Sequence, residues 1–335
     1  MSIKGDDGKE LCPSVLRLAE DVPEIMAYSK YTTVKHRLDM LKGFKSLLKE
    51  GNKIESTIGG FTNTLRVKHR NIQNLPGVDK PYGELIRGIF CAREGLISMG
   101  SDLSGLEDRT KHHFMLAHDP EYVETMMQDN YDAHITMALS AGMISKEEFD
   151  EFMGGVKKDH VVAARKKGKT TNYASVYGGS PPAIARAAEV PLSEAEKLYE
   201  GYWKLNWSVK AIADEQYVFQ DSSGGSWLVN PVNGFCYSLR KESDRFSTLA
   251  QGTGSFFFDM WIDGMLERFQ KRFGRKVMST CQHDETVVIH KDTPCMRKAV
   301  QEILLESLGE VNETFKLRRK LGCDIQFGKR YSEIH

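Results

Sequence analysis

Apolar and polar positions follow two different periods along the chain, and these periods predict a mixture of helices and strands. Residues 13–50 carry apolar side chains at an irregular helical spacing, and residues 105–153 do so again. Between them, residues 96–103 form a short apolar run that ends close to Asp102. A short run of this kind is typical of a buried strand, so we expect one strand between two helical regions.

Turn and capping residues predict where the next elements begin and end. Asp159 is a suitable N-cap for a helix that runs through Tyr177 and ends at Gly178, because the glycine and prolines that follow cannot continue it. The segment Ser-Glu-Ala-Glu at 193–196 has the pattern of a capping box and predicts another helix, which continues to about residue 204. Both helices fall in the middle of the chain.

The last third of the sequence is expected to contain two hairpins and a long helix. An Asn-Gly pair predicts a hairpin over residues 226–239, and a helical pattern follows over residues 247–273. Two β-rich runs within 276–290 are separated by only four residues, which places Asp284 and Glu285 at the tip of a hairpin. The alternation of helices and short strands predicts an α+β fold with a large helical insertion.

Size and composition narrow the class of protein. With 335 residues, of which 40% are hydrophobic, the chain can bury a core and form one to three domains. No repeat, low-complexity tract or linker divides it, so its domains are expected to be interleaved. No apolar run approaches the roughly 20 residues of a membrane span and no signal peptide is found, so a cytoplasmic protein with no membrane partner is expected. The six cysteines form no CxxC pair, which argues against a zinc knuckle.

The net charge of zero conceals local patches of opposite sign. Residues 101–155 contain twelve acidic and three basic residues, whereas residues 157–170 contain six basic residues and one acidic residue. Because local patches set the electric field that a phosphate group meets, a neutral chain is still compatible with a polyanionic ligand. A solvated charged face is the alternative explanation for each patch taken alone.

Two aspartates are expected at neighbouring strand ends, Asp102 and Asp284. Mg²⁺ takes few carboxylates from a protein and completes its coordination with water and substrate phosphates. Two such ions, roughly 3.5–4 Å apart, can activate an attacking oxygen and stabilise a leaving one. A strand-end aspartate is more often a turn or capping residue, so Asp102 alone does not establish a metal site.

One face of the helix expected after Asp159 combines cations with aromatic rings. Its residues are spaced four apart and form a gently drifting stripe, which consists of Arg165, Lys169, Tyr173 and Tyr177. Such a stripe is a poor core face, which leaves a solvated helix or a surface that grips a triphosphate and stacks on a nucleoside. The order of two cations followed by two rings favours the second explanation.

Together these residues resemble the motifs of the polymerase domain of the DNA polymerase I family (family A), and within it the replicative DNA polymerases of short-tailed bacteriophages. Motif A, DxSxxExR, is matched by Asp102, Ser104, Glu107 and Arg109. Motif B, RxxxKxxx[FY]xxxYG, is matched by Arg165, Lys169, Tyr173, Tyr177 and Gly178. Motif C, HDE, is matched by His283, Asp284 and Glu285. Shorter segments match in family order, at 64–66, 71–76, 83–87, 132–134 and 251–253.

The resemblance implies a right-hand polymerase fold, in which an antiparallel-sheet palm carries a large helical fingers insertion and a remnant of the thumb. The implied divisions are a thumb base at 1–55, palm at 56–109, fingers at 110–245 and palm again at 246–335. The implied activity is template-directed 5′–3′ DNA synthesis, with primer-template DNA and dNTPs as partners. A single-subunit RNA polymerase and a non-catalytic DNA-binding subunit are the alternatives, and Glu107 and the metal aspartates argue against them.

The resemblance also assigns roles to individual residues. Two Mg²⁺ ions, for which Mn²⁺ can substitute, would be held by Asp102, Asp284 and the Leu103 carbonyl, and Glu285 belongs to the same catalytic group. The incoming dNTP would be bound by Arg165, Lys169, Tyr173, Glu107 and His134. Within this set, Lys169 could protonate the departing pyrophosphate and Glu107 would exclude ribonucleotides. Primer and template would be bound by Arg66, Asn71, Gln73, Asn74, Tyr177, Gly178, Gln251 and His283.

Two departures from the family pattern affect these expectations. The segment between Arg66 and Asn71 is about two residues shorter than usual, which weakens the assignment of Arg66. Family members also carry a proofreading exonuclease and a full thumb ahead of the palm. We therefore expect a separate chain to supply the 3′–5′ exonuclease and most of the thumb.

Overall fold

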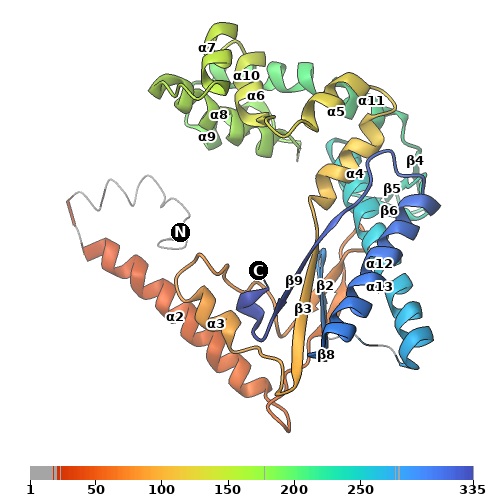
Figure 1. The fold of residues 1–335 in the computed structure, drawn as a ribbon. Helices are drawn as coiled ribbons and strands as arrows, with labels where there is room; N and C mark the ends of the chain where they lie inside the picture. The colour runs from red at the N-terminus through yellow and green to blue at the C-terminus, as the bar shows by residue number, and fades with distance from the viewer. Residues whose placement is uncertain are drawn as a thin grey trace.

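The computed structural model describes residues 18, 21–22, 24–176, 178–275, 277 and 280–334. Figure 1 shows three regions in an open, C-shaped arrangement: a sheet with two long helices beside it, a group of helices above it, and helix α2 (Glu24–Leu47) to its left. Tyr177 lies outside the described residues, so the structure gives no account of its predicted role. None of the described helices is long and apolar enough to cross a membrane.

The central sheet has four antiparallel strands in the order β7-β8-β3-β9. Its strands are β3 (Leu96–Leu103), β7 (Thr280–Gln282), β8 (Glu285–Lys291) and β9 (Cys323–Gly328). The short apolar run of the sequence forms β3, which is buried because it pairs with β8 on one side and with β9 on the other. The β-rich run before the hairpin tip forms only the short strand β7 among its described residues.

Alternate residues of β3 face opposite sides of the sheet. Met99 and Leu103 pack into the main hydrophobic core with side chains of α12 (Arg245–Phe273) and α13 (Pro294–Thr314). Asp102 lies one position out of phase with them and is exposed on the opposite face. The helices therefore cover one face of the sheet, and Asp102 belongs to the other.

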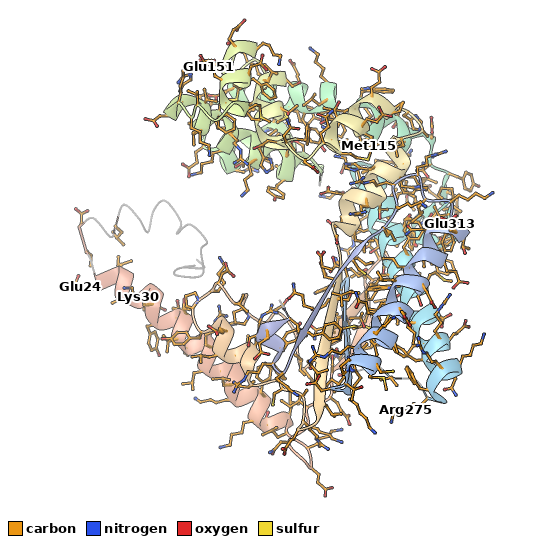
Figure 2. All side chains as sticks on the ribbon, viewed as in Figure 1. Glu24, Lys30, Met115, Glu151, Arg275 and Glu313 are labelled. Carbon is orange, nitrogen blue, oxygen red and sulfur yellow. The ribbon has the colours of Figure 1, made fainter. Side chains whose placement is uncertain are left out.

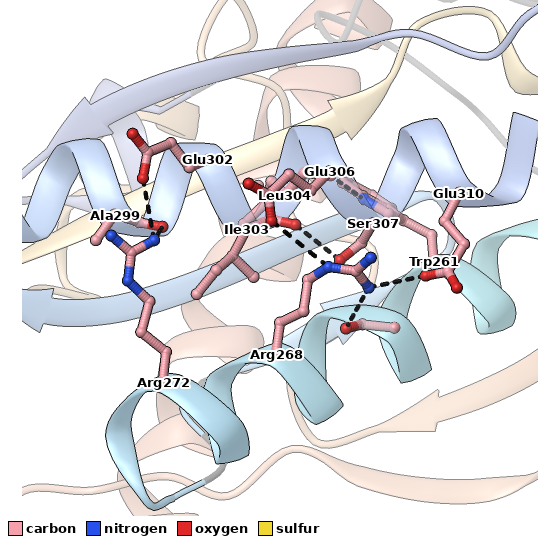
Figure 3. A network of polar contacts seen from close by, with 11 residues as sticks. Trp261, Arg268, Arg272, Ala299, Glu302, Ile303, Leu304, Glu306, Ser307 and Glu310 are labelled. Atoms are coloured by element: carbon pink, nitrogen blue, oxygen red, sulfur yellow. Dashed lines mark hydrogen bonds and ion pairs between the residues drawn. The ribbon is translucent and has the colours of Figure 1, made fainter.

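Helices α12 and α13 are joined by polar contacts along their length (Figure 3). The Arg268 guanidinium lies 2.9 Å from a Glu310 carboxylate oxygen and 3.7 Å from one of Glu306. The buried indole N–H of Trp261 donates to the Leu304 carbonyl at 3.0 Å. As predicted, α12 is one long helix, and it begins two residues earlier than expected. Thr293 caps α13 and Pro294 is its first residue.

The predicted helical region 105–153 is interrupted more often than its spacing suggests. It contains four helices: α4 (Leu106–Met115), α5 (Pro120–Met126), α6 (Ala133–Ser140) and α7 (Lys146–Met153). The side chains of Asp119, Asp132 and Ser145 cap the last three helices. Each cap starts a new helix, although the helical spacing of apolar residues continues from one helix to the next. Figure 2 labels the buried Met115 at the end of α4, where the chain passes from the sheet into the upper helices.

The remaining helices of the upper group are α8 (Asp159–Val176), α9 (Pro181–Ala188), α10 (Leu192–Leu205) and α11 (Trp207–Glu215). The capping-box prediction at 193–196 was wrong: α10 begins at Leu192, one residue after Pro191, and has no side-chain cap. A proline fixes φ and suits a helix start without a cap. A capping box is found instead at the start of α7, between Ser145 and Glu148.

Two smaller sheets complete the fold. The hairpin of β1 (Thr57–Phe61) and β2 (Val67–Arg70) lies next to the helix α3 (Gly83–Gly88) in sequence. The predicted hairpin at 226–239 is confirmed as β5 (Ser226–Val229) paired with β6 (Cys236–Leu239), and β4 (Val218–Gln220) extends it. Short 3₁₀ turns, η1 (Glu242–Asp244) and η2 (Tyr331–Glu333), precede α12 and follow β9. The predicted α+β class with antiparallel sheets is confirmed.

Candidate active site

Strand pairing brings the two predicted metal aspartates together. Asp102, near the end of β3, is the Cα partner of Glu285 on β8. The next backbone N–H, that of Leu103, donates to the carbonyl of Asp284 at 3.0 Å. Asp102 and Asp284 thus occupy adjacent ends of neighbouring strands, where the sequence placed them.

The peptide unit between Leu103 and Ser104 has a fixed direction. The Ser104 N–H donates to the Gly322 carbonyl, on the β9 side, at 2.9 Å. No peptide bond of the described chain is cis, and in a trans peptide the carbonyl points away from the N–H that follows it. The Leu103 carbonyl therefore points to the β8 side, where Asp284 lies.

This set of oxygen donors fits a hard divalent cation that takes few protein ligands. Two carboxylates and a carbonyl are the donors that Mg²⁺ prefers, with water and substrate phosphates completing its octahedron. Within the described part of the chain, no group of three or more His, Cys, Asp and Glu side chains is arranged to hold a metal. Asp102, Asp284 and the Leu103 carbonyl are the residues that would hold such an ion.

Arg66 lies between two carboxylates of the site. Its guanidinium nitrogens lie 3.8 Å from an Asp284 oxygen and 4.0 Å from a Glu107 oxygen. It follows the turn between β1 and β2, where the Thr62 hydroxyl accepts from its backbone N–H at 3.1 Å. The structure thus places Arg66 at the centre despite the shortened segment that follows it.

Glu285 is held by a tyrosine from the end of the chain. The Tyr331 hydroxyl donates to a Glu285 carboxylate oxygen at 2.8 Å. Burial raises the pKa of Tyr331 far above its ordinary value, and the neighbouring Glu285 raises it further. Tyr331 therefore stays protonated and acts as a donor that fixes Glu285 beside Asp284.

The cationic stripe of α8 faces away from the buried side of its helix. Lys169 is exposed, and Tyr173 exposes 59% of its surface. The Arg165 guanidinium donates to an Asp132 carboxylate oxygen at 2.6 Å, and Asp132 also caps α6. Burial acts to raise the pKa of Asp132, but the Arg165 and backbone hydrogen bonds outweigh it and lower the pKa below its usual value. Asp132 therefore remains ionised and holds Arg165 in place.

His134 lies beside this stripe. Its ring centroid is 6.0 Å from that of Tyr173, and its Nδ1 lies 3.3 Å from the amide nitrogen of Asn172. Burial lowers the pKa of His134, and the nearby Arg165 and Lys169 lower it further, against the opposing effect of Asp132. At neutral pH the imidazole is uncharged and can offer a neutral N–H to a ligand.

A cavity of about 560 Å³ joins these groups. Five predicted site residues line it: Glu107, His134, Tyr173, Gln251 and Asp284. At its far end lie Lys111 and Asn206, which the sequence did not indicate, and the Lys111 ammonium donates to the Asn206 side-chain oxygen at 3.1 Å. Burial lowers the pKa of Lys111, and Asp108 partly opposes this. The sequence did not indicate that Lys111 is buried, because it lies in a strongly acidic segment.

Part of the set predicted for primer and template, the segment of Asn71, Gln73 and Asn74, is linked to the hairpin that carries His283. The Gln282 side chain donates to the Ile72 carbonyl at 2.8 Å, which ties the segment of Asn71, Gln73 and Asn74 to β7. Asn71, Asn74 and His283 all have positive φ angles, so this surface consists of tight turns. Gly178 also has a positive φ of 73°, just after α8, and a Cβ there would lie 3.1 Å from Ser243.

Comparisons with known proteins identify the family of the chain. A family model for DNA polymerase family A matches residues 13–333. The thermostable DNA polymerase I of Thermus thermophilus is 27% identical in an alignment 274 residues long, which covers 78% of this chain and 31% of that protein. The DNA-directed DNA polymerase of Enterobacteria phage T3 is 25% identical in an alignment 322 residues long, which covers 88% of this chain and 43% of that protein.

A solved structure supports the fold. The POL domain of Pol1 from M. smegmatis, in complex with DNA primer-template and dNTP, matches with a TM-score of 0.73 and 17% sequence identity. The match covers 99% of this chain and 58% of that chain. The chain thus spans less than half the length of the two curated relatives above and somewhat more than half of this domain.

Proposed function

The chain belongs to DNA polymerase family A, and from this premise we propose that it performs template-directed 5′–3′ DNA synthesis, the transfer of a nucleotide from a dNTP to a primer 3′-OH. The observation that supports this most is the position of Asp284, which lies beside the strand end of Asp102 and lines a cavity that the motif B residue Tyr173 also lines. Residues of motifs A, B and C, far apart in sequence, meet at this cavity as Glu107, Tyr173 and Asp284. Neither group alone would suffice for the reaction.

Asp102, Asp284 and the Leu103 carbonyl would hold the divalent ions. When bound, two such ions stabilise charge on the attacking and the leaving oxygen. We assign Mg²⁺ as the physiological ion and Mn²⁺ as a substitute. Glu285, fixed by Tyr331, adds negative charge next to Asp284.

The triphosphate would lie against α8. Lys169 is exposed on the stripe, and Arg165 is held by Asp132, so both can meet phosphate oxygens with charge-assisted hydrogen bonds. Lys169 would give its proton to the departing pyrophosphate, and His134 would add a neutral donor. Tyr173 would stack on the incoming nucleoside, while the carboxylate of Glu107 would fill the space that a ribose 2′-hydroxyl needs.

Primer and template would lie across the hairpin tip. The residues for this surface are Arg66, Asn71, Gln73, Asn74, Gln251 and His283, joined by Tyr177 and Gly178 at the end of the stripe. Minor-groove acceptors are common to all base pairs, so such contacts check pair geometry without reading sequence. Closing of the upper helices over a correct pair would then complete the site.

The region assignments follow from this function: thumb base at 1–55, palm at 56–109 and 246–335, and fingers at 110–245. We place the reaction in the cytoplasm, and in that of the host if the chain is phage-encoded.

We also propose that a separate chain supplies the 3′–5′ exonuclease and most of the thumb. An apolar groove of about 800 Å³ between α2 and α3 supports this. Six large apolar side chains line it and are exposed: Val34, Leu38, Leu41, Tyr82, Leu85 and Ile89. Exposed apolar surface of this kind is typical of a protein interface. If the isolated chain copies long templates without dissociating, no such partner is needed and this part of the proposal is wrong.

The first experiment is primer extension by the purified chain with Mg²⁺, a primed template and either dNTPs or rNTPs. We expect extension with dNTPs only. Asp284→Asn should lower the rate by at least about 10³-fold, since loss of metal charge stabilisation costs several kcal/mol and each 1.36 kcal/mol is tenfold in rate. The exposed Asp129→Asn serves as a control. Extension with rNTPs would instead favour an RNA polymerase, and unchanged extension by Asp284→Asn would refute the assignment of the centre.

A further inference from the structure

A third aspartate lies beside the two that the sequence predicts. In the pairing of β3 with β9, Asp324 is the direct partner of Asp102. Directly opposed residues of an antiparallel pair project to the same face of the sheet. Asp324, Asp102 and Glu285 therefore share one face, on three adjacent strands.

Asp324 is bonded to the residue that follows the Leu103 carbonyl. The Ser104 hydroxyl donates to an Asp324 carboxylate oxygen at 3.2 Å, and the Ser104 N–H donates to the Gly322 carbonyl at 2.9 Å. Both contacts pull Ser104 toward β9. Since the carbonyl before it points the opposite way, they direct the Leu103 carbonyl toward Asp284.

The hydrogen bond between Ser104 and Asp324 is needed because the regular backbone pairing of β3 ends at Leu103. β3 stops at Leu103, and Gly105 follows in a left-handed conformation with a φ of 59° and no side-chain cap for α4. Arg109, one turn into α4, donates to the Lys320 carbonyl in the loop before β9. The side chains of Ser104 and Arg109, both in the DxSxxExR segment, thus bind the β9 side.

We infer that Asp324 is a positioning residue of this centre: through Ser104 it fixes the peptide unit that presents the Leu103 carbonyl, and it thereby sets the affinity for divalent cations. This rests on the proposed function, because it assumes that Asp102, Asp284 and the carbonyl hold those cations. Groups that orient a metal ligand without touching the metal typically affect affinity by about 10–100-fold. Asp324 acts in this way on a backbone ligand.

The test measures Mn²⁺ binding to the purified full chain by electron paramagnetic resonance. No DNA is present, so the readout does not depend on catalysis. Asp324→Ala and Ser104→Ala should each weaken Mn²⁺ binding by about 10-fold. The double variant should lose no more affinity than the single variant with the larger loss, because both substitutions remove the same hydrogen bond. Asp324→Asn keeps an oxygen acceptor and should stay within about 3-fold of the unmodified chain. Gln326→Ala, exposed two residues along β9, is the matched control.

Three results would overturn the inference: unchanged Mn²⁺ affinity in Asp324→Ala, equal losses in Asp324→Asn and Asp324→Ala, or additive losses in the double variant. The second would mean that charge, not position, is what Asp324 contributes. Thermal unfolding of each variant separates these results from a loss of folding. Absence of DNA synthesis by the unmodified chain, both alone and with the proposed exonuclease and thumb chain added, would refute the proposed function while leaving the Mn²⁺ comparison intact.

Discussion

The two sides of the candidate site are built in different ways. On the sheet side, Asp102 and Asp284 owe their positions to backbone hydrogen bonds, since β3 is paired on both sides. On the helical side, the cationic stripe stands on a single helix, and Arg165 is held by one side-chain contact to Asp132. From these contacts we expect the acidic side to be the rigid wall of the site and the cationic side to be its mobile wall. A polymerase needs both, because the chemistry requires fixed geometry and the test of the base pair requires motion.

The largest effect on the mobile wall is expected from Lys169→Ala. Loss of a general acid together with a phosphate contact should lower the rate of extension by about 10²–10⁴-fold, measured in single turnovers with saturating dNTP. Lys167→Ala, whose ammonium pairs with Glu194 at 2.7 Å, is the control on the same helix. If Lys169→Ala raises only the KM for dNTP, the lysine binds phosphate but transfers no proton.

A smaller effect is expected from Glu107→Ala, which changes a carboxylate in the first turn of α4 that is not among the proposed metal ligands. Opening the space beside the sugar should raise the ratio of rNTP to dNTP incorporation by about 10–200-fold, the range for a modest change in pocket shape. Extension with dNTPs should fall much less than in Asp284→Asn. An unchanged ratio would show that another residue excludes the 2′-hydroxyl.

The smallest effect concerns stability at the junction of the two walls. Burial, with help from Lys111, lowers the pKa of His112 on α4 to about 4. The unfolded chain binds a proton near its ordinary value of 6.5. Since the folded state resists this proton, stability present above pH 6.5 is lost as the pH falls toward 4. Between pH 7.5 and 4.5 the unmodified chain should lose free energy of unfolding, and His112→Asn should reduce this loss by about 2–3 kcal/mol, at 1.36 kcal/mol per pKa unit. Urea unfolding at the two pH values measures it. Equal slopes in both proteins would contradict this.

Much of the rigid wall could be predicted from the sequence because its signals are local. A short apolar run identifies β3, and a four-residue turn between β-rich runs places Asp284 at a tip. The cationic stripe of the mobile wall could also be predicted from the sequence, since residues four apart lie on one face of a helix. In both cases a period or a turn within a few residues carries the information.

The supporting residues could not be found in this way. Asp324 reaches Asp102 through strand pairing between segments more than two hundred residues apart, and no local pattern records that pairing. Lys111 is buried where its ammonium meets Asn206, the residue between α10 and α11. The acidic residues next to Lys111 in the sequence give no indication of this contact. The start of α10 was misplaced because a proline outweighed a capping pattern that lay two residues later.

The position of Arg66 has a consequence for how the centre accepts its ligands. Its guanidinium acts as a tethered counter-ion, 3.8 Å and 4.0 Å from the carboxylates of Asp284 and Glu107, too far for tight hydrogen bonds to either. Partly exposed pairs of this kind are weak. If Asp284 holds a cation as proposed, we expect that cation to displace the arginine at little cost and to leave the guanidinium available to an acceptor at the primer end. The same side chain would then serve first as a counter-ion for Asp284 and afterwards as a contact to the primer.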